Sequence, residues 1–184
     1  MIFCIILIIL SIAADQLSKY LVVENLVEIG SFPLIENILH FTYVENRGAA
    51  FGMLSNHRWV FMVLSVLGIG AMIVWLAWDK PKSLWMRAAI SLVIGGGIGN
   101  MIDRIALGYV IDFIDCRFID FYVFNIADSC VCVGCAMFLI GAIYEEVKNT
   151  KAKKAAEENG ENAEESSVEA ADTEETTIGD GGNE

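Results

Sequence analysis

The sequence lacks several features that mark common soluble functions. Its 184 residues show no basic patch, which argues against a nucleic-acid partner. There is no His-Glu-x-x-His motif, and the glycine run at 95–99 is not followed by the Lys-Ser or Lys-Thr of a phosphate-binding loop. The five cysteines form no disulfide framework. Cys130, Cys132 and Cys135 would spread too widely around a helix for a compact metal site, so we expect no metal and no other cofactor.

Charge is missing from long stretches, and this predicts a membrane protein. Hydrophobic residues make up 55% of the chain, and the mean hydropathy is +0.54. Apolar runs at about 2–23, 59–78, 86–107 and 124–144 can each cross a bilayer core of about 30 Å. We therefore expect an all-α transmembrane bundle of four helices. A cleaved signal peptide is the rival interpretation of the first run, but it lacks a basic start and its apolar pattern continues past Lys19.

The distribution of basic residues predicts which side of the membrane each connection faces. Lysine and arginine gather at 80–87 and 148–154, after the second and fourth runs, which makes both segments cytoplasmic. Both termini are then cytoplasmic, and the longer connections 24–57 and 108–123 lie outside. Short β-like runs within 27–44 predict a small extracytoplasmic β-cradle at the outer surface.

The negative charge is concentrated at the end of the chain. Residues 145–184 contain 13 acidic and 4 basic residues, so most of the net charge of −12 lies there. This composition predicts that residues 149–184 form a disordered, acidic cytoplasmic tail. Residues 1–148 are expected to form the integral membrane domain. No feature of the tail indicates a partner.

Two aspartates are the main candidates for chemistry. Asp112 follows an alternating, extended stretch, and Asp128 lies in the first turn of the last run, where the helix dipole favours an anion. If the two approach, like-charge repulsion raises the pKa of one of them. One carboxylate can then take a proton from water while the other, protonated, polarises a carbonyl, as in aspartic proteases. Asp115 and Asp120 are nearby competitors for these roles.

Other polar residues allow both a structural and a functional interpretation. Asp15 and Lys19 are four residues apart on a helix and can pair, with Lys19 snorkelling to the interface, or they can help to build a site at the outer surface. Asn46 precedes the small residues Gly48, Ala49, Ala50 and Gly52, whose segment forms either an ordinary turn or a loop that contacts substrate.

The third apolar run combines glycines with polar groups. Gly95 and Gly99 have the G-x-x-x-G spacing that favours close packing of membrane helices. Asn100, Asp103 and Arg104 share a face near the outer end of this helix. A polar cap that fixes helix packing is the favoured interpretation of Asp103 and Arg104.

Five blocks carry a resemblance to a known family. DQLSK, ENRGAAFG, GGGIGNMIDR, GYVIDF and FNIADS occur in this order, and over about residues 10–135 the chain resembles the lipoprotein signal peptidase (signal peptidase II, prolipoprotein signal peptidase) family. The resemblance implies an intramembrane aspartic endopeptidase of the bacterial plasma membrane. Such an enzyme cleaves prolipoprotein signal peptides just before a diacylglyceryl-modified cysteine. It also implies four spanning helices, an outer β-cradle and a small helical lobe.

The resemblance further implies roles for individual residues. It makes Asp112 and Asp128 catalytic. The positions that it implies line or support the site are Asp15, Lys19, Asn46, Asn100, Asp103, Arg104 and Asn125. By hypothesis, Asn46 and Asn125 orient the substrate backbone, and Arg104 holds the loop that carries Asp112. The expected partners are lipidated prolipoprotein signal peptides and membrane lipids, with the enzyme acting as a monomer.

Two other classes of function remain open from the residues alone. A small proton-coupled transporter or channel subunit could use Asp15, Asp103 and Asp128 as a relay, although the chain lacks the internal repeats that transporters often show. An assembly factor could use its carboxylates only to pack helices. Cleavage of a lipidated prolipoprotein would distinguish the peptidase from both.

Overall fold

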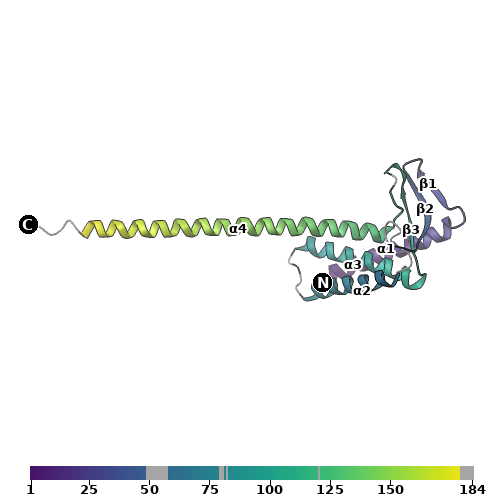
Figure 1. Ribbon diagram of the computed structural model, residues 1–184, viewed down its shortest axis with the longest axis horizontal. Coiled ribbons are helices and arrows are strands. Elements are labelled where there is room, and N and C mark those ends of the chain that lie inside the picture. The colour runs from purple at the N-terminus through teal and green to yellow at the C-terminus, as the bar shows by residue number, and fades with distance from the viewer. Residues whose placement is uncertain (49–57, 79–80, 82, 120, 179–184) are drawn as a thin grey trace, which may run out of the picture. The chain divides into compact units, whose positions relative to one another are not determined.

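The computed structural model describes residues 1–48, 58–78, 81, 83–119 and 121–178 (Figure 1). The elements in chain order are α1 (Ile2–Leu26), β1 (Ser31–Ile35), β2 (Leu39–Asn46), α2 (Arg58–Trp78), α3 (Leu84–Ala106), β3 (Val110–Cys116), a 3-10 turn (Arg117–Ile119) and α4 (Ile126–Ile178). The chain divides into two compact units, Met1–Leu139 and Ile140–Glu184. The first unit contains all of the candidate site residues.

Within the described residues, three helical segments are long and apolar enough to cross a membrane. They are Ile2–Leu26, Leu84–Ala106 and Ile126–Lys154. α2 coincides with the predicted second span, but its apolar helical part, Met62–Trp78, is shorter. The mostly helical architecture with a small sheet is therefore confirmed, whereas the count of four spans remains a prediction.

Small residues on α3 allow its neighbours to approach closely. A Cβ atom added at Gly95 would lie 2.7 Å from Ser11 Cβ, and one added at Gly99 would lie 2.6 Å from Asp15 Oδ2, both on α1. Gly96 is in similarly close contact with the backbone of Ala127 on α4. A larger side chain at these positions would push the helices apart, so the predicted packing role of the glycine run is confirmed.

The three strands form an antiparallel sheet in the order β1-β2-β3, with β2 in the centre. The register places Val44 opposite Asp112 and Asn46 opposite Val110. Since side chains two residues apart on a strand share one face, Asn46 lies diagonally across from Asp112 on the same face. The pairing of β2 with β3 thus brings an amide from one connection to a carboxylate from the other.

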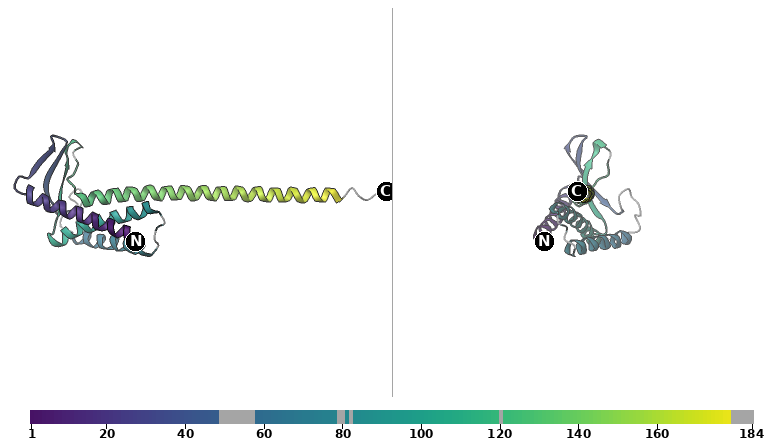
Figure 2. Two further views of the ribbon diagram at one scale, coloured as in Figure 1. Left: turned by 180° about the vertical axis from the view of Figure 1, so that it is seen from behind. Right: turned by 90° about the vertical axis from the view of Figure 1, so that its left-hand side faces the viewer.

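The sheet lies beside the C-terminal end of α1, whereas the N-terminus lies at the opposite end of the helices (Figures 1 and 2). An apolar cluster joins α1 to β3, and its buried members are Val22, Leu26, Ile111 and Phe113. Burial of these side chains fixes β3 against α1 just where Asp112 occurs in the strand.

α4 is helical to Ile178, and the disorder that the acidic composition of residues 149–184 predicts remains a prediction. Residues 151–175 are rich in alanine, glutamate and lysine, which have high intrinsic helix propensity. The low hydrophobicity on which that prediction rests leaves this part of the helix without an apolar face to pack.

Candidate active site

Asp112 and Asp128 meet where β3 passes the start of α4, and Asn125 joins them. Asn125 Nδ2 donates a hydrogen bond of 2.7 Å to Asp112 Oδ1. The Asn125 backbone N–H donates to Asp128 Oδ2 at 3.3 Å, and Asn125 Oδ1 accepts from the Asp128 N–H at 2.8 Å. Asn125 is fully buried and Asp112 is only 2% exposed, whereas Asp128 is half-buried.

The position of Asp128 follows from local sequence. The reciprocal bonds between Asn125 and Asp128 form a capping box, in which the residue before the helix and the third helical residue satisfy each other's backbone N–H groups. The sequence Asn-Ile-Ala-Asp therefore both starts α4 and orients the Asp128 carboxylate.

Two further asparagines complete what we call the amide layer, which consists of Asn46, Asn100 and Asn125. Asn46 Nδ2 donates to Asp112 Oδ2 at 2.9 Å, and Asn100 Nδ2 donates to Asp128 Oδ1 at 2.7 Å. All the hydrogen bonds recorded for the two carboxylates thus come from uncharged N–H groups.

The surroundings of Asp112 favour its protonated form. Burial raises the pKa of the Asp112 carboxyl from 3.8 to about 6, and the nearby Asp128 carboxylate adds to this rise. The hydrogen bonds from Asn46 and Asn125 and the more distant charge of Lys19 oppose it. A carboxyl with such a pKa can both hold and release a proton near neutral pH, as general acid–base chemistry requires.

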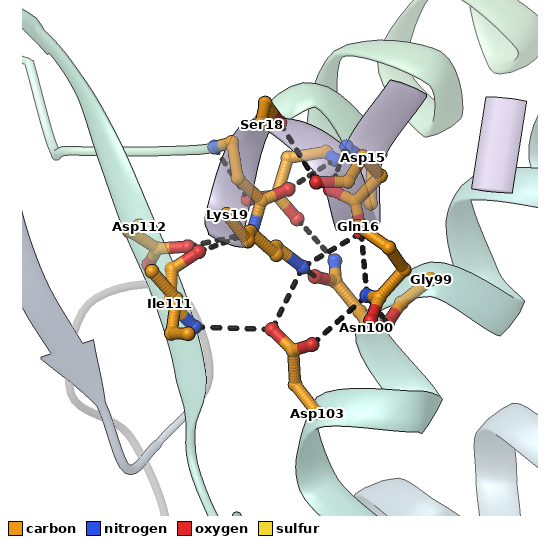
Figure 3. A network of polar contacts seen from close by, with 12 residues as sticks. Asp15, Gln16, Ser18, Lys19, Gly99, Asn100, Asp103, Ile111 and Asp112 are labelled. Atoms are coloured by element: carbon orange, nitrogen blue, oxygen red, sulfur yellow. Dashed lines mark hydrogen bonds and ion pairs between the residues drawn. The ribbon is translucent and has the colours of Figure 1, made fainter. Parts of the chain in front are cut away.

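A second cluster, the charged triad of Asp15, Lys19 and Asp103, lies next to Asn100 of the amide layer (Figure 3). Lys19 Nζ is 2.8 Å from Asp15 Oδ2 and 2.8 Å from Asp103 Oδ2, and it donates to Asn100 Oδ1 at 3.0 Å. Lys19 is only 2% exposed, so the predicted pairing with Asp15 is confirmed and the predicted snorkelling is wrong. An acceptor for each ammonium proton makes full burial preferable to solvation at the interface.

The charged triad also contacts the backbone next to the aspartate pair. Asp103 Oδ2 accepts from the Ile111 N–H at 3.2 Å, and Asp15 Oδ1 accepts from the Ala127 N–H at 2.9 Å. Asp103 is therefore more than the helix cap that its position predicted, because its oxygens bond to α1 and β3.

Gln16 belongs to this cluster and was not among the predicted site residues. Its Nε2 lies within hydrogen-bonding distance of Asp103 Oδ1 (3.0 Å), Asp15 Oδ2 (3.2 Å) and the Gly99 carbonyl oxygen (3.2 Å). The sequence did contain a signal for Gln16: it is an uncharged polar residue next to an aspartate inside an apolar helix. A buried polar side chain of this kind needs a hydrogen-bond partner.

Arg104 makes no recorded hydrogen bond to the side chain of another predicted site residue, although its charge interacts with those of Asp128, Asp112 and Asp103. Its Nη1 donates to the Asn100 carbonyl oxygen on the same helix at 3.3 Å, and no recorded hydrogen bond of Arg104 reaches β3. It lines an open cavity of about 330 Å³ together with Trp59, Met62 and residues 105–108. The hypothesis that Arg104 holds the loop carrying Asp112 therefore has no support in the described contacts.

Asp115, one of the two competing aspartates, is not in the cluster. Asp115 Oδ2 accepts from Thr42 Oγ1 at 2.8 Å and from Arg117 Nε at 3.0 Å, away from the Asp112 side chain. Asp120 and residues 49–57, which include most of the predicted substrate loop, lie outside the described residues. The first part of that loop is seen where the Gly48 N–H donates to Asn46 Oδ1 at 3.0 Å.

Metal-binding groups do not converge in the part of the chain that the structure describes. No cluster of three or more His, Cys, Asp or Glu side chains there could hold a metal ion. All five cysteines are free, and Cys132 and Cys135, which are spaced as C-x-x-C, are exposed on α4.

Comparison with known proteins agrees with the geometry. A family model described as Signal peptidase (SPase) II matches residues 7–144. The lipoprotein signal peptidase of Clostridioides difficile (strain 630) is 46% identical over 145 residues, which cover 79% of this chain and 97% of that protein. The lipoprotein signal peptidase of Streptococcus pyogenes serotype M1 is 45% identical over 138 residues, which cover 75% and 91%.

A solved structure described as a bacterial membrane enzyme also matches, with a TM-score of 0.73 and 35% identity. The alignment covers 80% of this chain and 90% of that one. The family model and the relatives match three quarters of the chain or more, and the fold matches as well. We conclude that this chain belongs to the signal peptidase II family.

Proposed function

We propose that this protein is an aspartic endopeptidase of the membrane that removes signal peptides from prolipoproteins, with Asp112 and Asp128 as its catalytic residues. Membership in the signal peptidase II family and relatives named lipoprotein signal peptidase support the reaction. The observation that carries the residue assignment is a pair of neighbouring carboxylates held only by neutral donors, with the pKa of Asp112 raised to about 6.

The pair would work as a unit that shares one proton. The ionised carboxylate removes a proton from water while the protonated one donates a hydrogen bond to the scissile carbonyl oxygen. Attack of the hydroxide forms a tetrahedral intermediate, and its collapse breaks the C–N bond as the pair delivers a proton to the leaving amine. Because coupled carboxylates titrate together, the order of protonation belongs to the pair rather than to either residue.

The substrate would be cut at the peptide bond N-terminal to a diacylglyceryl-modified cysteine, close to the outer membrane surface. This placement needs four spans, both termini in the cytoplasm and the sheet outside in the bacterial plasma membrane. The basic segments 80–87 and 148–154 support the orientation. In this arrangement the lipid chains stay in the outer leaflet, and Asn46 and Arg104 are available to contact substrate. We expect the enzyme to act as a monomer among membrane lipids.

Cleavage of a purified diacylglyceryl-modified prolipoprotein, followed by mass spectrometry of the product, tests this function. Asp112→Asn and Asp128→Asn should each lower kcat by about 10³-fold or more, because neither amide can exchange the proton. Asp115→Asn, on the same strand, is the matched control and should retain full activity. Thermal unfolding and gel filtration verify that each variant is folded. Substantial cleavage by folded Asp112→Asn or Asp128→Asn protein would exclude the pair.

The peptidase domain is proposed to consist of residues 1–148, with residues 149–184 dispensable for the reaction. All of the site residues precede Leu139, within the first compact unit. A chain that ends at Lys154 keeps the basic residues of segment 148–154 and should cleave the same substrate with unchanged kcat and KM. A lower kcat or a higher KM would assign a role to the acidic segment.

A further inference from the structure

We propose that the charged triad of Asp15, Lys19 and Asp103 acts as a clamp that sets the separation of Asp112 and Asp128 through the backbone immediately before each of them. This inference rests on the proposed catalytic role of the two aspartates. The members of the triad are positioning residues, because they act through the peptide chain and do not contact either carboxylate of the pair.

One arm of the clamp holds β3. Asp103 Oδ2 accepts a hydrogen bond of 3.2 Å from the N–H of Ile111, and the next residue is Asp112. The Cα atoms of successive residues are separated by a fixed distance of about 3.8 Å, so a shift of Ile111 is passed directly to Asp112.

The other arm holds the first turn of α4. Asp15 Oδ1 accepts a hydrogen bond of 2.9 Å from the N–H of Ala127, and the next residue is Asp128. The first N–H groups of a helix have no partner within the helix, so this donor is available only because it begins α4. The two arms are therefore equivalent, since each buried carboxylate binds the residue that precedes one aspartate of the pair.

Lys19 joins the arms. Its Nζ lies 2.8 Å from each carboxylate, and Gln16 Nε2 is within 3.2 Å of Asp15 Oδ2 and 3.0 Å of Asp103 Oδ1. Asp15, Lys19 and Asp103 are 0%, 2% and 3% exposed. Separating a buried charge from its partner is strongly destabilising, which favours the arrangement in which Lys19 bonds to both carboxylates. This arrangement also fixes the spacing of the two arms.

Lys19 has a second positioning effect, on the amide layer. An ammonium group can only donate hydrogen bonds, so its 3.0 Å contact requires the oxygen of the Asn100 amide to face Lys19. The Asn100 NH₂ group must then point the other way, where it donates to Asp128 Oδ1 at 2.7 Å. Lys19, together with Asn125 Nδ2, which also donates to Asn100 Oδ1 at 3.0 Å, thus fixes which end of the Asn100 amide faces the catalytic pair.

If the triad only held α1 and α3 together, contacts between these two helices would be sufficient. Here each carboxylate uses one oxygen to bind backbone outside α1 and α3, at β3 and at the start of α4. A substitution that removes this acceptor should therefore change kcat more than it changes substrate binding.

Asparagine and alanine variants of the full-length protein distinguish two hypotheses. In the clamp, the hydrogen bond to the backbone matters; in the alternative, only the negative charge matters. Asp103→Ala removes both the charge and the acceptor, whereas in Asp103→Asn the amide oxygen can take the place of Oδ2 toward Ile111. A displacement of the order of 1 Å costs about 10²-fold in rate, so we expect Asp103→Ala to lower kcat about 100-fold with KM changed less than about threefold. Asp103→Asn should recover about tenfold of that loss. Asp15→Ala and Asp15→Asn should show the same pattern.

The control pair is Asp115→Ala and Asp115→Asn, which removes a β3 carboxylate that bonds to Thr42 and Arg117 and not to backbone beside the pair. Neither control should change kcat. Equal losses for the asparagine and alanine variants, or a loss confined to KM, would overturn the clamp. If the alanine variants do not fold, the asparagine variants decide: a kcat as low as that of Asp112→Asn contradicts the clamp, and retention of about a tenth or more supports it.

The same experiments keep this inference separate from the proposed function. If Asp112→Asn and Asp128→Asn are inactive while Asp103→Ala retains full activity, only the clamp is wrong. If folded Asp112→Asn or Asp128→Asn protein cleaves substrate normally, the proposed catalytic pair is wrong, whatever the result at Asp15 and Asp103.

Discussion

The amide layer and the charged triad are adjacent buried polar clusters, yet they treat charge in opposite ways. The amide layer contacts Asp112 and Asp128 only with neutral N–H groups, whereas the triad binds its two carboxylates to a lysine. A cation bonded to Asp112 would favour its ionised form and lower its pKa. Neutral amides orient the carboxylate and still allow its pKa to rise to about 6.

The difference shows how a site can combine rigidity with reactivity. Strong ion pairing fixes Asp15, Lys19 and Asp103, which have no proton to transfer in the proposed reaction. The two carboxylates that we propose as catalytic are held by weaker bonds from groups that cannot accept or release a proton near neutral pH. Contact between the clusters passes through Asn100 and through two backbone N–H groups. Substitutions in the two clusters should therefore have different kinetic consequences.

Apart from the two aspartates themselves, the largest effect is expected from Asn125, the residue that contacts both of them. Asn125→Ala removes the donor to Asp112 and the cap that orients Asp128, and the loss of one such preorganised donor typically costs about 10²–10³-fold in kcat. Steady-state cleavage kinetics measure this. Ser129→Ala, which removes only a bond to the Asn125 carbonyl oxygen, is the control and should have little effect. Similar kinetics for both variants would argue against a special role of the amide layer.

An intermediate effect is expected where α3 packs against the charged triad. A Cβ at position 99 would lie 2.6 Å from Asp15 Oδ2, so Gly99→Ala must displace Asp15 or separate α1 from α3. We expect a lower thermal unfolding midpoint, corresponding to about 1–3 kcal/mol of overpacking, together with a lower kcat.

Gly68→Ala on α2 is the matched control for this change, since a Cβ there would meet nothing within 4 Å. It should leave the midpoint unchanged or raise it slightly, because alanine has the higher helix propensity. If both variants unfold at the wild-type temperature, the close contact between α3 and Asp15 does not contribute to stability.

The smallest effect on rate, and the sharpest on pH dependence, is expected at Asn46. Its hydrogen bond stabilises the ionised form of Asp112 and so lowers the pKa of that carboxyl. Asn46→Ala should raise this pKa. The aspartate pair then loses its last proton only at a higher pH. The alkaline limb of kcat/KM against pH should therefore move upward.

Thr42→Val, on the same strand, provides the control for the pH profile, since Thr42 bonds to Asp115 and not to Asp112. Its profile should match that of the wild type. A downward shift for Asn46→Ala would mean that Asn46 stabilises the protonated carboxyl instead.

Some of the interactions could be predicted because they depend on short spacings. Asp15 and Lys19 pair because they are four residues apart on one helix. Gly95 and Gly99 face α1 because the same spacing places them on one side of α3. Arg104 shows the limit of such reasoning: its helical position was known, but not whether its side chain would reach β3, and its recorded bond stays on α3.

The sequence by itself determined the apolar helices, the glycine-lined packing face and the two aspartates as candidates. These properties follow from composition and from contacts within a few residues. Only the tertiary structure decided that Lys19 joins Asp15 to Asp103, that Gln16 belongs to the cluster, and that buried carboxylates bind the backbone beside Asp112 and Asp128. The reason is physical: these bonds link residues as many as 112 positions apart, and their partners are fixed by the packing of α1, α3, β3 and α4.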